Sequence, residues 1–280
     1  MIKINMFKYS LFLILSLCHA KDVILSSGLG NYTDSQLLQQ YTAYKAYKDI
    51  GLITTSSILL YNLNQDGTLG YYNTSSNITS KQYQRSLKSE LGLKAMPCLY
   101  CDSTIGMCSN FSSRFANLYA NMSTFIKSTI IEAIEYDWDG YYVDFEPDTA
   151  VDSTQITDFV LAWTFELKIY GLVLNLWIGG NAPYDDRIYN SDILLTTMNT
   201  YGSDYSDFIS IASALQTTTI NISNLGFGLL TNYGDTNDTS GSYIDQIINW
   251  SILTKSNSLS LWASHINPDW FFALNKFFNA

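Results

Sequence analysis

The chain has 280 residues, with 15 Lys and Arg against 25 Asp and Glu, a formal net charge of −10. A chain this acidic is a poor partner for nucleic acid and for anionic membrane surfaces. About 260 residues remain after an N-terminal leader, which fits the ~250 residues of one (β/α)8 barrel better than a small domain.

The first 20 residues have the pattern of a cleavable secretory signal peptide. Two lysines precede an apolar run over 11–18, and the small Ala20 comes just before Lys21. The run is shorter than a membrane span requires. We therefore expect residues 1–20 to be removed, and residues 21–280 to be secreted or delivered to a lysosomal or vacuolar lumen. Eight Asn-x-Ser/Thr acceptors agree with this route and predict a glycoprotein.

Eight short apolar runs bounded by turn residues predict strands that are buried on both faces. They cover residues 23–25, 57–63, 93–100, 141–145, 172–178, 193–198, 225–230 and 259–263. Segments with helical spacing lie between several of them, at 35–47, 115–136, 153–169, 205–215 and 243–253. This alternation, without a Gly-x-Gly-x-x-Gly turn, predicts the α/β class and a single-domain (β/α)8 TIM barrel. About 50 residues follow Asn232, too few for a large insertion domain.

Two loops are indicated along the chain. The polar stretch 71–80 predicts a surface loop, and Cys101 and Cys108 flank a second one that a disulfide could close. Cys98 sits in an apolar run and is expected to pack as a buried thiol. No zinc site is expected, because there is no second Cys pair and His265 is the only histidine after the leader.

The fourth expected strand carries two carboxylates near its C-terminal end, where barrel enzymes place catalytic groups. Alternation along a strand predicts an inward face of Gly140, Tyr142, Asp144 and Glu146 and an outward face of Tyr141, Val143 and Phe145. Burying a charge costs several kcal/mol unless it is paired, so two carboxylates on the inward face of one strand indicate a functional role. We expect Glu146 to donate a proton and Asp144, while ionised, to raise the pKa of Glu146. Alternatively, both make ordinary loop hydrogen bonds.

The spacing of Asp139, Gly140, Asp144 and Glu146 resembles the Asp-Gly-x-Asp-x-Asp-x-Glu signature of glycoside hydrolase family 18, which contains chitinases, chitobiases and endo-β-N-acetylglucosaminidases. Residues 57–69 are similar to the family's second strand and its turn, and Trp262 to its eighth-strand tryptophan. The resemblance implies substrate-assisted hydrolysis. In that mechanism Glu146 protonates the leaving oxygen and Asp144 holds the acetamide nitrogen of an N-acetylglucosamine.

The chain departs from the family pattern at three places. Tyr142 replaces the middle aspartate, so we expect Asp144 to stay ionised to lower pH than beside a second carboxylate. Residues 98–101 replace the family's Ser-x-Gly-Gly. On the sixth strand Thr200 stands in strict register where the acetamide-binding tyrosine is expected, and Tyr201 would serve with a shift of one residue.

Aromatic rings are the usual floor of a sugar site, because the C–H face of a pyranose stacks on them. We expect Trp177 and Trp262, and less centrally Tyr61 and Tyr142, to contact the substrate. The site needs no cofactor and no metal, and the partner is an N-acetylglucosamine-containing oligosaccharide or glycan bound by a monomer.

Three functions remain open from the sequence. The first is a retaining glycosidase of the chitinase, chitobiase or endo-β-N-acetylglucosaminidase type that cuts β-1,4 bonds next to N-acetylglucosamine. The second is a non-catalytic, chitinase-like lectin for the same sugars. The third is an unrelated barrel hydrolase that pairs Glu146 with a carboxylate such as Asp102 or Asp148. The short C-terminal part favours soluble oligosaccharides or glycan cores over crystalline chitin.

Overall fold

The computed structural model of the chain describes residues 21–28, 32–72, 78–102, 108–147, 151–178, 184–189, 191, 195–199, 206, 208–210, 224–230, 243–262 and 265–280. The expected leader, residues 1–20, lies outside them, as does most of the helix expected over 205–215.

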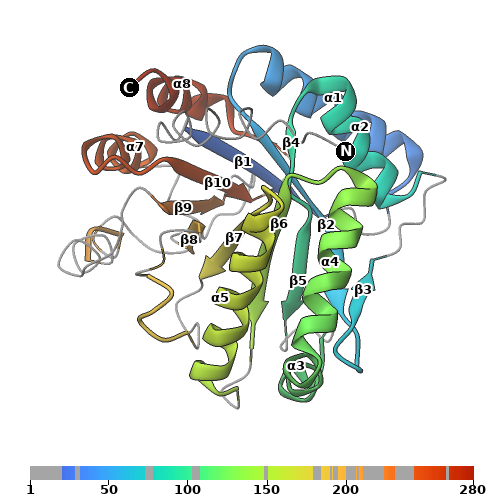
Figure 1. Cartoon of the computed structure of the whole chain (residues 1–280). Coiled ribbons are helices and arrows are strands. Elements are labelled where there is room, and N and C mark those ends of the chain that lie inside the picture. Colours follow the sequence, from blue (N-terminus) through green and yellow to red (C-terminus); the bar gives the residue numbers. More distant parts are fainter. Residues whose placement is uncertain are drawn as a thin grey trace, which may run out of the picture.

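Within this described part, eight parallel strands pair in a closed ring (Figure 1). In chain order they are β1 (Asp22–Ser27), β2 (Thr55–Leu63), β5 (Cys98–Asp102), β6 (Gly140–Glu146), β7 (Val173–Ile178), β8 (Leu195–Asn199), β9 (Leu225–Leu230) and β10 (Ser258–Trp262). Each strand pairs with the next, and β10 pairs with β1. The single-domain (β/α)8 class expected from the sequence is confirmed.

Two short strands extend the sheet beyond the ring. β3 (Leu69–Tyr71) runs antiparallel to the end of β2, and β4 (Lys94–Ala95) pairs with the start of β2. Neither was expected as a separate element. They pair alongside the two ends of β2, while the ring itself keeps the eight strands that the apolar runs predicted.

Helices cover the outside of the ring, with α4 and α5 side by side along β5 to β7 in Figure 1. They are α1 (Asp34–Asp49), α2 (Ser80–Leu91), α3 (Phe111–Ala120), α4 (Met122–Tyr136), α5 (Ser153–Ile169), α7 (Ile244–Leu253) and α8 (Phe271–Asn279), with a 3-10 turn η4 (Pro268–Trp270). The sequence missed α2, whose start carries a capping box between Thr79 and Gln82. One helix was expected over 115–136, but the chain is broken at Asn121 into α3 and α4.

The apolar residues form two separate clusters, one between strands and helices and one inside the ring. On β6, Tyr141 and Val143 belong to the outer cluster, whereas Tyr142 belongs to the inner one with Cys98 and Trp177. The alternation expected for the strand that carries Asp144 and Glu146 is therefore confirmed. It leaves the inward positions of β6 facing the barrel axis.

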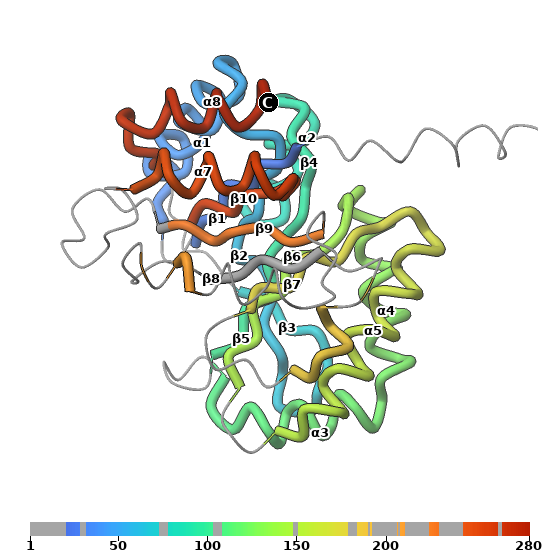
Figure 2. Tube along the Cα trace, turned by 90° about the vertical axis from the view of Figure 1, so that its left-hand side faces the viewer, coloured from blue at the N-terminus to red at the C-terminus, as the bar shows by residue number. Residues whose placement is uncertain are grey.

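The two ends of the described chain meet on one side of the barrel. Lys21 donates from Nζ to the carbonyl oxygen of Phe277 at 2.6 Å, and Tyr47 on α1 packs edge-on against Phe271 on α8. Figure 2 shows α8 and α7 beside α1 on that side. Over the described residues, no helix combines the length and apolarity of a membrane span.

Candidate active site

The start of β6 is fixed by the motif residues Asp139 and Gly140. The Asp139 carboxylate accepts a hydrogen bond from the Ala95 amide at 2.7 Å and forms an ion pair with Lys88 at 3.1 Å. Gly140 has φ +154, and a Cβ there would lie 1.9 Å from the carbonyl oxygen of Val173 on β7. Only glycine allows β6 to approach β7 this closely, so these two residues set the position of the strand.

Asp144 and Glu146 lie on the inward face at the C-terminal end of β6. Asp144 is 5% exposed and Glu146 is exposed. The Oδ1 atom of Asp144 has no hydrogen-bond partner among the described residues. Burial, and then the charge of Glu146, raises the pKa of Asp144 well above its usual range. Glu146 is thus an accessible acid next to the buried Asp144, whose Oδ1 atom is available to a polar atom of a ligand.

A third carboxylate completes the cluster. Asp102 ends β5, is 3% exposed, and is the Cα partner of Glu146. Burial first, and then the charge of Asp102, raises the pKa of Glu146. Two expectations are therefore wrong: the like charge beside Glu146 comes from Asp102 and not from Asp144, and Asp144 does have a second carboxylate near it. The pKa of Asp144 is raised above its usual range, and burial is the largest cause.

Sequence reasoning considered Asp102 only as the partner in an unrelated hydrolase. The position of Asp102 at the C-terminal end of the third barrel strand could have indicated it, because barrel enzymes carry their catalytic residues at these strand ends. Asp148, the other partner considered, lies outside the described residues.

Tyr142 lies inside the barrel directly below Asp144. Its hydroxyl shares a hydrogen bond of 2.7 Å with Ser260 on β10, and its ring lies 6.0 Å from the ring of Trp177. Cys98 is its Cα partner on β5 and is a free, buried thiol, as expected. Tyr142 therefore bridges β6 to the opposite side of the ring.

The two tryptophans expected in the site differ in how much of their surface is exposed. Trp177 is the Cα partner of Asp144 on β7. It is only 2% exposed, however, because its ring fills the space over Gly228, where a Cβ would lie 2.2 Å from the ring. Trp177 is thus part of the barrel interior and does not present the open stacking surface we expected. Trp262, at the C-terminal end of β10, is half-buried and keeps part of its surface accessible.

Tyr61 does not reach the site. It is fully buried in the outer cluster, where its hydroxyl donates to Glu132 on α4 and accepts from Trp138, both at 2.9 Å. The register of β2 against β5 shifts between Leu59 and Tyr61, so Leu59 packs against the inner cluster while Tyr61 turns outward. The expectation of a sugar contact at Tyr61 is wrong for this reason. Thr200 and Tyr201 lie outside the described residues.

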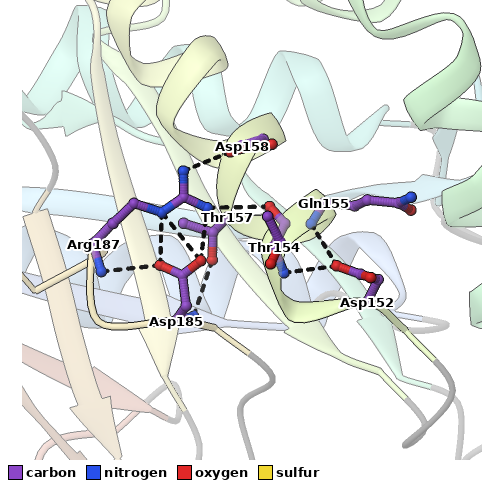
Figure 3. A network of polar contacts seen from close by, with 7 residues as sticks. All are labelled: Asp152, Thr154, Gln155, Thr157, Asp158, Asp185 and Arg187. Carbon is purple, nitrogen blue, oxygen red and sulfur yellow. Dashed lines mark hydrogen bonds and ion pairs between the residues drawn. The ribbon is translucent and has the colours of Figure 1, made fainter.

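A polar network at the rim joins the start of α5 to the segment that follows β7 (Figure 3). Arg187 pairs with Asp158 on α5 and with Asp185, each at 2.7 Å, and the Asp185 amide donates to the Thr157 hydroxyl at 3.0 Å. Along the chain, α5 follows β6 and the segment 184–187 follows β7. The network joins these two segments, although exposed ion pairs such as these add little stability.

The same segment brings one more hydroxyl toward the carboxylates. The hydroxyl of Tyr184 is buried and has no hydrogen-bond partner among the described residues. Burial, and then the charge of Asp144, raises the pKa of Tyr184. The sequence did not indicate Tyr184, because it lies between expected strands in a segment without periodicity.

The loop after β5 is closed by the disulfide between Cys101 and Cys108, so the pairing expected from the sequence is confirmed. The Cys108 amide also donates to the carbonyl oxygen of Asp102 at 3.2 Å. These bonds fix the end of β5 where Asp102 lies. In the described part of the chain, no group of three or more His, Cys, Asp or Glu side chains has the arrangement of a metal site.

No family model and no curated protein matches the sequence. Solved structures do match. A chitinase from Chromobacterium violaceum has a TM-score of 0.72 at 13% identity, over 93% of this chain and 100% of that one. The spore cortex-lytic enzyme of Bacillus megaterium has a TM-score of 0.70 at 11% identity, over 91% of this chain and 73% of that one.

A third match is a chitinase-like agglutinin from Robinia pseudoacacia. Its TM-score is 0.64 at 14% identity, over 90% of this chain and 98% of that one. Identities this low carry no information about activity, but the match over nearly the whole chain shows the architecture. The chain has the chitinase-type (β/α)8 barrel fold that the resemblance to glycoside hydrolase family 18 implied.

Proposed function

We propose that the protein is a glycosidase that cleaves β-1,4 bonds next to N-acetylglucosamine, in chitooligosaccharides or in the chitobiose core of N-glycans. The observation that carries the proposal is the inward pair of Asp144 and Glu146 at the C-terminal end of β6, in a barrel of chitinase type. In barrel enzymes this end of the strands holds the catalytic groups.

Glu146 is the proton donor in this proposal. It is accessible to a substrate, and burial together with the charge of Asp102 raises its pKa, which favours the protonated form that a general acid needs. A neutral carboxyl group donates to the glycosidic oxygen as the bond to the leaving sugar breaks. Glu146, then ionised, accepts a proton from the attacking water in the second step.

Asp144 is the group that holds the acetamide. Its unpartnered Oδ1 is a buried acceptor that fits the acetamide N–H. Two residues of strand separate the Cα atoms of Asp144 and Glu146 by about 6.5 Å and place both on one side of the sugar. They cannot act as opposing acid and base, so the acetamide oxygen supplies the nucleophile, and Asp144 accepts the acetamide N–H and holds the group in place as the oxazolinium forms.

The test is incubation with chitobiose, chitotetraose and a high-mannose glycopeptide, followed by mass analysis of the products. Glu146→Gln should abolish hydrolysis and retain sugar binding, because the amide keeps the shape but cannot donate a proton; general acid catalysis is typically worth about 10²–10⁴-fold. Glu135→Gln, an identical charge change on the exposed side of α4, is the matched control and should keep full activity. Equal turnover by the wild type and Glu146→Gln would remove Glu146 from this role.

The acetamide mechanism has its own test. A thiazoline analogue of N-acetylglucosamine imitates the cyclic intermediate and should inhibit in the micromolar range or below, since sites bind such analogues at least about 10²-fold more tightly than substrate. An active enzyme that the thiazoline does not inhibit would rule out the substrate-assisted route.

A lectin for the same sugars is the second candidate, because the Robinia agglutinin shares the fold and Tyr142 replaces the aspartate of the family signature. Binding of chitotetraose without turnover of any of the three substrates would favour it. In either case we propose a secreted or lumenal glycoprotein that acts as a monomer.

A further inference from the structure

Asp102 is a buried carboxylate placed directly against the proposed acid. It pairs in register with Glu146 across β5 and β6. Side chains alternate along β5, with Tyr100 packed against the inner cluster and Cys101 in the outer one, so Asp102 also faces the barrel axis. Neighbouring strands lie about 4.8 Å apart, which brings the two carboxyl groups beside each other.

Several bonds hold Asp102 in this place. Its Oδ2 accepts a hydrogen bond from the Tyr100 hydroxyl at 3.0 Å, and its carbonyl oxygen accepts one from the Cys108 amide. The adjacent Cys101 is tied to Cys108 by the disulfide. An acid that is 3% exposed costs free energy to bury, so a position fixed this firmly is unlike a solvated loop carboxylate.

We propose that Asp102 is a positioning residue of the acid site and that its negative charge keeps the proton on Glu146 between turnovers. This inference rests on the proposed function, since it takes Glu146 as the acid. Raising the pKa of Glu146, which the sequence analysis expected of Asp144, is here assigned to Asp102 on β5. It also supplies the second carboxylate that the Tyr142 substitution removed from β6.

The other groups that face Glu146 support this division of tasks. They are Asp144 on β6 itself, Tyr100 on β5 and, near Asp144, Tyr184 after β7. Burial raises the pKa of all three above their usual values, so each stays neutral over a wider pH range. Among the charged groups near Glu146 in the described part of the chain, Asp102 is the one whose charge raises the pKa of Glu146.

A competing role for Asp102 is that of a nucleophile paired with Glu146, since retaining glycosidases place two carboxyl groups about 5–5.5 Å apart. The two roles predict different pH behaviour. A nucleophile is required at every pH, whereas a charge that holds a proton matters only where Glu146 would otherwise lose it.

The first experiment measures the titration of Glu146 without relying on turnover. The chain has five glutamates, so carboxyl-¹³C glutamate labelling yields five NMR signals, and the one missing from Glu146→Gln belongs to Glu146. In Asp102→Asn the titration midpoint of Glu146 should shift to lower pH. In Asp102→Glu, which keeps the charge, and in the surface control Glu135→Gln, it should stay near the wild-type value. An unchanged midpoint in Asp102→Asn overturns the proposal, whether or not the protein hydrolyses sugars.

The second experiment follows kcat against pH with whichever oligosaccharide is cleaved. Asp102→Asn should lose activity on the order of tenfold near neutral pH and little at the acid end, because one pKa unit changes the protonated fraction about tenfold. A loss that is equal at every pH and is rescued by azide would identify a nucleophile and overturn the proposal. If Asp102→Asn does not fold, as judged by circular dichroism, Asp102→Ser is titrated in its place with the same two outcomes.

Discussion

At the scale of single residues, burial decides the chemistry of the candidate site. Asp144 and Asp102 are both almost fully buried, while Glu146 between them remains accessible. Three acids on two neighbouring strands cannot all ionise cheaply. The protons therefore distribute unequally, and the accessible acid is the one that a substrate can reach.

The raised pKa of Asp144 predicts a pH-dependent cost to stability. For this acid the folded-state pKa lies above the unfolded value of about 3.9, so its contribution to stability is fully present below that pH. It is lost as the pH rises through the folded-state pKa. The Asp144→Asn side chain cannot ionise, so the variant does not lose stability in this way. As the pH rises above 4, the free energy of unfolding of the wild type should therefore fall relative to that of Asp144→Asn, by about 1.4 kcal/mol per pH unit between the two pKa values.

Urea denaturation of both proteins between pH 4 and pH 8 measures this difference. Asp66→Asn is the control: hydrogen bonds from Thr68 lower the pKa of Asp66, so its contribution to stability is lost only as the pH falls below about 4, and its curve should run nearly parallel to the wild type over this range. Parallel pH curves for the wild type and Asp144→Asn would contradict the burial argument.

At the scale of elements, two local features of the backbone decide which side chains reach the barrel axis. Gly140 lets β6 approach β7, and the irregular register in β2 turns Tyr61 outward. Alternation predicted β6 correctly because its pairing is regular. It failed for β2, since a shift in register cannot be seen in an apolar run.

Gly140→Ala should destabilise the protein far more than a substitution that changes only backbone freedom. The new Cβ would meet the carbonyl oxygen of Val173 at 1.9 Å, whereas Gly51, at φ +73, has no atom within 4 Å of its Cβ position. We expect Gly51→Ala to cost about 1–2 kcal/mol and Gly140→Ala at least about 2 kcal/mol more. Chemical denaturation of the two variants checks this, and equal losses would show that β6 can shift to make room.

At the scale of the whole molecule, the ring closes through contacts between distant parts of the chain. Tyr142 and Ser260 share a hydrogen bond across the barrel, and Lys21 reaches Phe277 on α8. The Nζ atom of Lys21 also lies 4.9 Å from the centre of the Phe277 ring. Lys21 thus joins the first described strand to the last helix.

We predict that the mature protein begins at Lys21. Expression in a eukaryotic secretory host, followed by N-terminal sequencing of the protein from the medium, should find this residue after cleavage behind the small Ala20. The three acceptors that lie among the described residues, Asn110, Asn121 and Asn249, are exposed. Enzymatic deglycosylation should therefore lower the mass. Retention of residues 1–20 would contradict the secretory assignment.

The sequence by itself determined the barrel class, its eight strands, the inward face of β6 and the pairing of Cys101 with Cys108. These follow from apolar periodicity, which is local, and from short spacings along the chain. The tertiary structure alone decided that Asp102 lies against Glu146, that Trp177 is enclosed and that Tyr61 faces the helices. Each depends on strand register or on packing between segments far apart in sequence, and register across a ring of strands is not encoded in any one of them.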